Sequence, residues 1–517
     1  MAPVKPKKAA PRAVANTVSI PSPTAGLNSK DPLAKMDEQF AVTLENWFPT
    51  PTSVDIRNGM SAHVTGLGAI TETLAEYNNT TTKKIFAGAG TAYYDVTSAG
   101  AVGGSVISGL TNVRHQHINM SNSGGHFLMM VNGADKLRGY DGTNWWVDGD
   151  GAHDISGLNT NTAIHINTFK RRVWLVEKNS MSAWYLPTDA ISGAAVEYDL
   201  GPIFKLGGSL NCMVNWTLNA STGIDDYAAF ISTNGEVALY QGTDPASATT
   251  WALVGTFRIG VPIGRRCCVK VGADVVILTT DGAIPLSKAL LTDKSQKQVA
   301  VTDKIDSLFS GDADLYKDNY GWQPILYPDG DKLIINVPKV AGVESYQYVM
   351  NTVHGAWCKF TGWNAYCFAV LDDTLYYGSD TKIYKADTGS SDDGSNITAV
   401  AQQAYSYFGK TGQLKRFTMC RPVFITNGEL TPAIVVNVDF QQNRTTSPPA
   451  YSVGDTELWD DGYWDDFDWA ADNQVYKKWI GVSALGYSAG IRLVTQSNDL
   501  TARWSSTDFI YERGGTF

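Results

Sequence analysis

The sequence lacks the excess of basic residues that tight nucleic-acid binding requires, because 51 aspartates and glutamates outnumber 41 lysines and arginines. With a formal net charge of −10, the chain as a whole repels phosphate. No apolar run approaches the length of about eighteen residues needed for a membrane span, and the N-terminus lacks the short apolar segment of a secretory signal. We therefore expect a protein with no membrane span that is not exported by the signal-peptide route.

Cysteine is scarce and irregularly placed, with six residues at positions 212, 267, 268, 358, 367 and 420. None of them has the C-x-x-C spacing of a zinc or redox motif. Cys267 and Cys268 are adjacent, which is poor geometry for an ordinary disulfide. The pattern is typical of buried free thiols, and the sequence nominates neither a metal site nor a cofactor.

Convincing helices are also few, and most of the chain has the pattern of short strands joined by tight turns. Asx-Gly pairs, which favour two-residue hairpin turns because these need positive φ, begin at residues 58, 132, 141, 234, 281, 329 and 427. The two best helical segments are Ile284 to Leu291 and Thr302 to Phe309, the second with Thr302 as the expected N-cap. We predict a mainly β protein.

A loose strand–turn–strand repeat, with aromatic residues in its second strand, recurs along the first four fifths of the chain. Its clearest copies begin near Lys84, His126, Tyr227 and Leu375. Propeller blades are typically about 40–50 residues long, so residues 55 to 395 would hold roughly six or seven of them. A propeller also suits a long β chain because radial repetition leaves only short sheet edges.

The composition suggests three parts. Residues 1–30 include Lys5, Lys7, Lys8 and Arg12 but no acid, and their Ala- and Pro-rich pattern predicts an extended basic arm without a core of its own. Residues 31–395 form the expected β-propeller-like domain, and a Ser/Asp/Gly-rich linker ends it. Residues 396–517 contain alternating strands that favour a C-terminal β-sandwich.

Several catalytic motifs occur without the structural context that they require. Gly486 to Gly490 has the G-x-S-x-G pattern around Ser488, but the following residues read as a strand and no histidine follows. Gly409-Lys410-Thr411 lacks the earlier glycine of a phosphate-binding loop. His115 and His117 would share one face of a strand, as in a metal site, but no further ligand pattern accompanies them. We therefore expect no enzymatic activity.

The densest feature of the sequence runs from Trp459 to Trp469 and contains Trp464 and five carboxylates. The carboxylates could hold Ca²⁺ through their oxygens, or the tryptophans could bind a sugar. Neither calcium-loop spacing nor an Asp-box is present. A turn that gathers the rings on one side and leaves the carboxylates in water is the interpretation that we favour.

The segment Asn46-Trp47-Phe48-Pro49, followed by Arg57 and Gly59, resembles the tail hub and nozzle proteins of short-tailed bacteriophages, also described as packaged-DNA stabilisation or tail tubular proteins. The resemblance continues in order through Phe230 to Pro245, Leu278 to Ser287, Tyr407 to Phe417 and the Trp459, Trp464 and Trp469 run. It therefore covers most of the chain after residue 30.

This resemblance implies a homo-hexameric ring in the virion, between the head-to-tail connector ring and the tail tip or tail fibres. The ring would retain packaged genomic DNA and conduct it during ejection without sequence specificity. An acidic wall fits that role because it repels phosphate and lets it slide. The resemblance does not account for the basic arm, which we expect to dock on a neighbouring tail protein or, less favourably, on DNA.

Two other functions stay open at this stage. A tail fibre or another receptor-binding, glycan-binding β protein would assemble as a trimer and carry an aromatic groove. A propeller glycosidase would need two carboxylates flanking the sugar bond, and the sequence nominates no such pair.

Overall fold

A computed structural model of the chain describes residues 15–220, 223–289, 299–442 and 474–514. The chain divides into two compact units. Unit 1 comprises residues 1–57, 356–358 and 394–517, and unit 2 comprises residues 58–355 and 359–393. Strand β32 (Trp357–Phe360) contains residues of both units.

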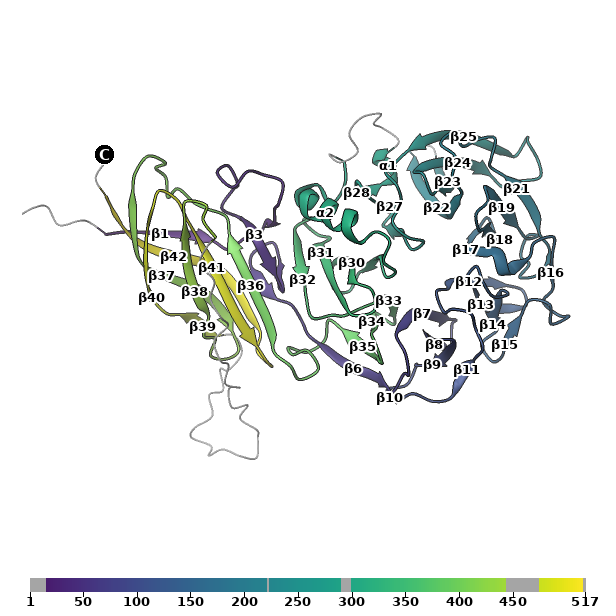
Figure 1. Cartoon of the computed structure of the whole chain (residues 1–517), viewed down its shortest axis with the longest axis horizontal. Coiled ribbons are helices and arrows are strands. Elements are labelled where there is room, and N and C mark those ends of the chain that lie inside the picture. Colours follow the sequence, from purple (N-terminus) through teal and green to yellow (C-terminus); the bar gives the residue numbers. More distant parts are fainter. Residues whose placement is uncertain (1–14, 221–222, 290–298, 443–473, 515–517) are drawn as a thin grey trace, which may run out of the picture. The chain divides into compact units, whose positions relative to one another are not determined.

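Unit 2 is a β-propeller with seven blades, shown as the ring of short strands in Figure 1. We number the blades along the chain. Blade 1 contains β7 (Thr71–Asn78), β8 (Lys83–Ala89), β9 (Ala92–Asp95) and β11 (Ser105–Ile107); blade 2, β12 (Gln116–Asn122), β13 (Gly125–Val131), β14 (Arg138–Tyr140) and β15 (Trp145–Val147); blade 3, β17 (Ala163–Phe169), β18 (Arg172–Glu177), β19 (Ser182–Tyr185) and β21 (Val196–Asp199); blade 4, β22 (Leu210–Ala220), β23 (Gly223–Ser232), β24 (Glu236–Gly242) and β25 (Trp251–Arg258).

The other three blades continue the same antiparallel pattern. Blade 5 contains β26 (Cys268–Val271), β27 (Asp274–Thr279) and β28 (Gly282–Pro285); blade 6, β29 (Gln323–Tyr327), β30 (Lys332–Val340) and β31 (Glu344–Asn351); blade 7, β33 (Cys367–Leu371), β34 (Thr374–Gly378), β35 (Lys382–Ala386) and β6 (Met60–Thr65). Short elements lie between and beside the blades: β10 (Gly100–Ala101), β16 (Ile155–Ser156), β20 (Gly193–Ala194), η1 (Thr160–Thr162), α1 (Leu286–Ala289), η3 (Asp303–Ile305) and α2 (Asp306–Tyr316).

The propeller is a closed ring. The first strands of successive blades contact one another around the ring and back to blade 1, except that β22 of blade 4 contacts β27, the second strand of blade 5. Blade 7 combines β6, from the start of unit 2, with three strands from its end, and β6 pairs antiparallel with β35. Hydrogen bonds between distant parts of the sequence therefore hold the ring shut, which leaves no long open sheet edge at the junction.

The propeller core lies between neighbouring blades. One buried cluster joins blades 3 and 4 around Trp174, Phe230 and Trp251, and the ring of Trp174 lies 5.8 Å from that of Trp251. Similar clusters join blades 7 and 1, blades 1 and 2, and blades 2 and 3. Blades pack on blades because each sheet buries both of its faces against its neighbours.

Unit 1 is a β-sandwich built from both ends of the chain (Figure 1). Its first sheet contains β1 (Ala15–Pro21), β4 (Trp47–Pro49), β5 (Val54–Ile56), β37 (Lys415–Thr426), β39 (Gln474–Lys477), β40 (Ile480–Gly486) and β42 (Ala502–Arg513). Its second layer is formed by β2 (Gly26–Leu27), β3 (Phe40–Glu45), β36 (Ile397–Gln403), β38 (Ala433–Val438) and β41 (Ala489–Ser497), which are the unit 1 strands of a nine-stranded sheet.

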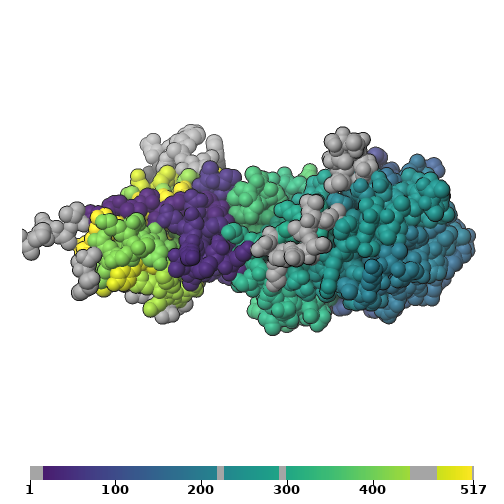
Figure 2. Space-filling model, turned by 90° about the horizontal axis from the view of Figure 1, so that it is seen from above, coloured from purple at the N-terminus to yellow at the C-terminus, as the bar shows by residue number. Residues whose placement is uncertain are grey.

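The first described residues belong to this sandwich. β1 pairs antiparallel with β42, in a register that runs from Ala15 opposite Glu512 to Pro21 opposite Ser506. Ile20 is buried at 3% exposure. Figure 2 shows the N-terminal segment, in purple, packed on the green and yellow C-terminal segment of the same unit. The predicted arm of residues 1–30 therefore needs correction, because from Ala15 onward it is part of a sheet.

The predicted fold class, a mainly β protein with a propeller-like domain and a β-sandwich, is confirmed. The four predicted repeats are the second and third strands of blades 1, 2, 4 and 7. The boundary predicted at 395 lies close to the observed division at 393, whereas residues 31–57 group with the sandwich and not with the propeller.

The predicted helices were only partly right. The segment 284–291 begins as a strand, and α1 covers Leu286–Ala289. The predicted capping role of Thr302 is wrong, because its side chain caps no helix N–H. Its hydroxyl instead accepts a hydrogen bond from the backbone N–H of Ala283 at 3.1 Å. No helix among the described residues is both long and apolar enough to cross a membrane.

Candidate functional site: the propeller channel and its basic mouth

The seven blades surround a channel lined by their first strands. A cavity of about 290 Å³ occupies this channel and touches at least one residue of each blade, among them Leu74 in blade 1 and Phe368 in blade 7. Its lining is mixed, because polar side chains such as Gln116, Asn167 and Gln323 alternate with apolar ones. A volume of this size corresponds to roughly ten water molecules at about 30 Å³ each.

A second cavity, of about 320 Å³, lies at the end of the channel where chain segments enter the first strands. Five cationic side chains line it but only one carboxylate, that of Asp318. We call this cavity the basic mouth and define it by its cations, Arg114, Lys178, Arg265, Arg266 and Lys317. Gln116, Arg265 and Arg266 line both cavities, which therefore adjoin each other.

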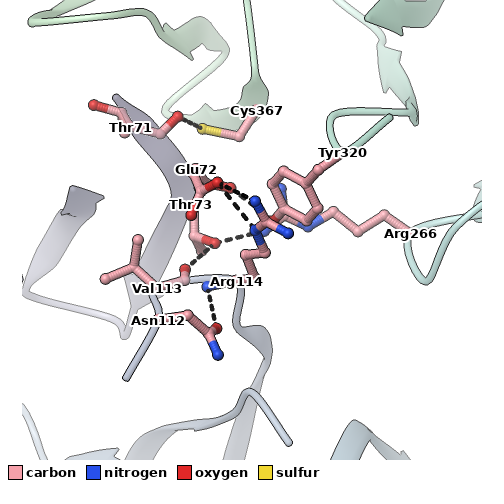
Figure 3. Close-up of polar contacts among 9 residues, drawn as sticks. All are labelled: Thr71, Glu72, Thr73, Asn112, Val113, Arg114, Arg266, Tyr320 and Cys367. Carbon is pink, nitrogen blue, oxygen red and sulfur yellow. Dashed lines mark hydrogen bonds and ion pairs between the residues drawn. The ribbon is translucent and has the colours of Figure 1, made fainter. Parts of the chain in front are cut away.

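The ring of Tyr320 holds two of the arginines in place (Figure 3). The guanidinium carbons of Arg114 and Arg266 lie 4.4 and 5.4 Å from the ring centroid. Arg114 also forms an ion pair with Glu72, at 2.9 Å, and the Tyr320 hydroxyl donates to the Glu72 carbonyl. Cation–π contacts and a hydrogen-bonded ion pair fix both guanidinium groups at the cavity wall.

Arg265 and Arg266 donate their hydrogen bonds to uncharged groups. Arg266 donates to the Thr73 hydroxyl and to the His115 carbonyl, at 2.5 and 3.1 Å. Arg265 donates to the carbonyl of Asn132, at 3.3 Å. Within the part of the chain that the structure describes, neither forms an ion pair. Burial, partly offset by Tyr320 and reinforced by Arg114, holds the pKa of Arg265 below its usual range, as expected for a cation that is partly removed from water.

This arrangement suits the binding of an anion. Partly buried guanidinium groups that form no ion pair among the described residues offer charge-assisted hydrogen bonds to carboxylate or phosphate oxygens. The described lining of the two cavities contains only the one carboxylate, so the two-carboxylate arrangement of a glycosidase is absent from it. The described lining contains no serine, and its only cysteine is Cys268.

The histidines near the channel have separate partners and do not converge. His115 is buried and contacts the Tyr93 hydroxyl through Nδ1 at 3.0 Å. His117 is hydrogen-bonded through Nε2 to the Glu76 carboxylate, at 2.7 Å. The paired-imidazole metal site that the His115-Gln116-His117 spacing suggests is therefore not formed.

Acidification should destabilise the propeller through His115. Burial lowers the pKa of His115 to about 3, so the folded state keeps the ring neutral while the unfolded state takes up a proton below about 6.5. The unfolded state binds more protons between these values, and stability therefore falls as the pH falls through this window. The expected loss at pH 5 relative to pH 7 is about 2 kcal/mol from this one group.

Denaturant unfolding of the native chain and of His115→Gln, at pH 7 and pH 5, measures this contribution. Glutamine does not titrate, so the variant should lose about 2 kcal/mol less stability on acidification than the native chain. Equal losses in the two proteins would contradict the assignment.

The first segment of the resemblance, Asn46 to Pro49 with Arg57 and Gly59, lies in unit 1 and at the start of unit 2, and we call these the family-like residues. Asn46 is buried with positive φ of 56°, and its side chain links the Thr398 carbonyl to the Nε of Arg57, both at 2.8 Å. Arg57 is itself only 3% exposed. These residues join β4 and β5 to β36 and have a structural role.

The other residues of this motif are also packed. Trp47 is fully buried, and its ring lies 6.2 Å from that of Phe424 and 6.0 Å from that of Trp504. Phe48 and Pro49 complete β4, and Pro49 is buried. Gly59 has no room for a side chain, because a Cβ would collide with the backbone of Ser391.

The remaining predicted sites lie outside the described residues. These are Lys5, Lys7, Lys8 and Arg12 of the basic arm, and the Trp459, Trp464 and Trp469 run. Ser488 is fully buried in the turn between two strands, β40 and β41, so the strand-to-helix context of a nucleophile elbow is missing.

No family model matches the sequence, and no curated protein matches it. The chain is similar to several solved structures, all at low identity. BBS1N in complex with ARL6DN is 11% identical over 64% of this chain and 98% of that one, with a TM-score of 0.40. A putative 6-phosphogluconolactonase from Bacteroides fragilis is 13% identical over 65% and 89%, with a TM-score of 0.37. The Cps50 (Swd1) β-propeller domain from Myceliophteria thermophila is 11% identical over 63% and 99%, with a TM-score of 0.36.

Proposed function

We propose that this protein is a structural, non-enzymatic subunit of the tail hub or nozzle ring of a short-tailed bacteriophage virion. The observation that carries the proposal is the position of the family-like residues. Asn46 and Arg57 are buried and hydrogen-bonded to each other, and Asn46 also bonds to β36. Trp47 is buried against Phe424 and Trp504, so the first segment of the resemblance builds the sandwich. Buried packing residues of this kind are expected to be alike in proteins that share a fold, and they do not by themselves indicate a shared chemical reaction.

The size of the propeller channel constrains how DNA would pass. The channel cavity has a volume of only about 290 Å³, which is too small to hold duplex DNA, whose major groove alone is about 12 Å wide. In the proposed ring, DNA would therefore pass through a bore formed between several subunits. Six copies would carry about −60 formal charges from the −10 of each chain, which favours sliding over tight binding.

The outer edge of the propeller supports self-association. β25, the last strand of blade 4, exposes Leu253 at 41% and Val254 at 51%. The last strand of blade 3, β21, exposes Val196 at 47%. Exposed apolar edge strands pair with other chains unless they are covered, and neighbouring subunits would cover them.

Native mass spectrometry of the purified protein, with its connector ring present if required, tests this assembly. The expected species is a hexamer of about 336 kDa, six times the 56.0 kDa of one chain. Val254→Lys should shift it towards monomers, whereas Leu315→Lys, at a residue 74% exposed on α2, should not. A native chain that stays monomeric under all these conditions would contradict the proposal.

The basic mouth favours one alternative to the hub or nozzle function, namely receptor binding. Its cations and Tyr320 suit an acidic sugar as well as a protein carboxylate, so a receptor-binding protein is the second candidate. That protein would assemble as a trimer, and the same mass measurement separates the two functions.

A further inference from the structure

Three cysteine sulfurs from two neighbouring blades meet beside the channel. Cys212 lies in β22, the first strand of blade 4. Cys267 and Cys268 lie at the start of blade 5, where β26 begins at Cys268. The Sγ–Sγ distances are 3.8 Å from Cys212 to Cys267, 3.8 Å from Cys212 to Cys268 and 3.6 Å from Cys267 to Cys268. No other such group of three or more His, Cys, Asp or Glu side chains occurs among the described residues.

Local backbone structure explains how adjacent cysteines can face the same point. Successive side chains of a regular strand point to opposite faces, but Cys267 precedes the first residue of β26 and is outside that strand. On the other blade, the pairing of β22 with β23 shifts register between Leu210 and Cys212. The start of β26 and the register shift in β22 both lie at the cluster, where they allow the three cysteine side chains to face one another.

The triangle has the dimensions of a thiolate metal site. Zinc–sulfur bonds of about 2.3 Å at tetrahedral angles place two sulfurs about 3.8 Å apart. The three observed distances therefore match one face of a tetrahedron around a zinc ion. Thiolate ligands select Zn²⁺ over the hard cations Mg²⁺ and Ca²⁺.

One side-chain amide reaches the cluster from a neighbouring residue. The Nδ2 of Asn211 lies 3.5 Å from the Cys267 sulfur, so this amide can donate a hydrogen bond to a thiolate at that position. A bound divalent cation would displace the thiol protons, as thiolate coordination requires.

The channel gives a cation access to this triangle. Cys268 lines the channel cavity, as does His165. Burial, and then the charge of Arg265, lower the pKa of His165 to about 4, so its ring is neutral near pH 7. His165 is outside the group of mutually close ligand atoms, so a zinc ion bound here would take its fourth ligand from solvent.

We propose that Cys212, Cys267 and Cys268 form a zinc site that ties blade 4 to blade 5 of the propeller. Each thiol loses a proton to solvent on binding, and three sulfur–zinc bonds form with no change in oxidation state. Because the folded chain binds the ion and the unfolded chain presents no preformed site, occupancy should raise the stability of the propeller.

Cobalt substitution in the full-length, reduced protein tests the site. Co²⁺ added to the metal-free native chain should give a thiolate-to-metal absorption band in the near ultraviolet that saturates at one equivalent per chain. Zn²⁺ should then abolish the band. Cys212→Ser and Cys268→Ser should each lose this stoichiometric binding, whereas Cys420→Ala, in the other unit, should retain it. His165→Gln should also retain it.

If a variant fails to fold, measurements of metal content and melting temperature on the native chain still test the zinc site. Zinc at one equivalent per chain, with a raised melting temperature that chelation reverses, supports the site. Absence of the cobalt band, or a Cys212–Cys267 disulfide that forms in air with no metal affinity in the reduced protein, overturns it.

Discussion

Replacement of Trp47 by alanine should lower the free energy of unfolding of unit 1 by about 3–5 kcal/mol, the usual cost of truncating a large buried aromatic side chain. Trp47 is fully buried and contacts Phe424 and Trp504 in the same sheet. The alanine variant would leave a cavity between these rings. Trp47→Phe keeps part of the contact and should cost less than half as much.

Amide hydrogen exchange measures the loss of stability in Trp47→Ala and shows which strands are affected. Amides of β37 and β42 should lose protection in Trp47→Ala, because Phe424 and Trp504 lie on these strands. Unchanged protection there would mean that Trp47 is not a structural residue, and the observation that carries the proposed function would fail.

Removal of residues 2–21 should disrupt the β-sandwich, whereas removal of residues 2–14 should not. The longer deletion removes β1, which pairs with β42 along its whole length and buries Ile20. It also leaves one edge of β42 unpaired from Ser506 to Glu512, which favours aggregation. The shorter deletion removes only Lys5, Lys7, Lys8, Arg12 and their neighbours.

Differential scanning calorimetry and size-exclusion chromatography compare the two deletions. We expect a lower melting temperature and aggregates for the 2–21 deletion alone. Equal melting temperatures would show that β1 contributes nothing. The 2–14 deletion isolates the basic arm, and it should weaken incorporation into tails if the arm docks on a neighbouring protein. Altered DNA retention with normal incorporation would favour DNA as the partner of the arm.

Local sequence patterns predict the propeller blades well because hairpins depend on nearby residues. The Asx-Gly pairs at 132, 141, 234, 281 and 329 all lie between antiparallel strand neighbours. The pairs at 58 and 427 do not. The first lies where the chain enters unit 2, and the second connects strands of different sheets in unit 1.

Long-range pairing is what the sequence does not predict. The pairing of β1 with β42 joins Ala15 to Glu512, and no local pattern indicates it. The composition of residues 1–30 predicts an arm because β1 is short and follows a Pro-rich segment. Its burial depends on a partner strand from the other end of the chain.

The channel residues are hidden from sequence patterns for the same reason. Arg114, Arg266 and Tyr320 come from three separate segments and meet only when the ring closes. The run Arg265-Arg266-Cys267-Cys268 is the one local signal of this region, since it places two cations beside two thiols. Cys212, which completes the sulfur triangle, lies on another blade and has no spacing motif with them.

Electron-microscopy class averages of the assembled protein test the proposed function most directly. A hub or nozzle subunit should give a sixfold ring with a central bore that admits duplex DNA, with the small propeller channels in the ring wall. Threefold particles without a bore, or single propeller–sandwich molecules in the presence of the connector ring, would contradict it.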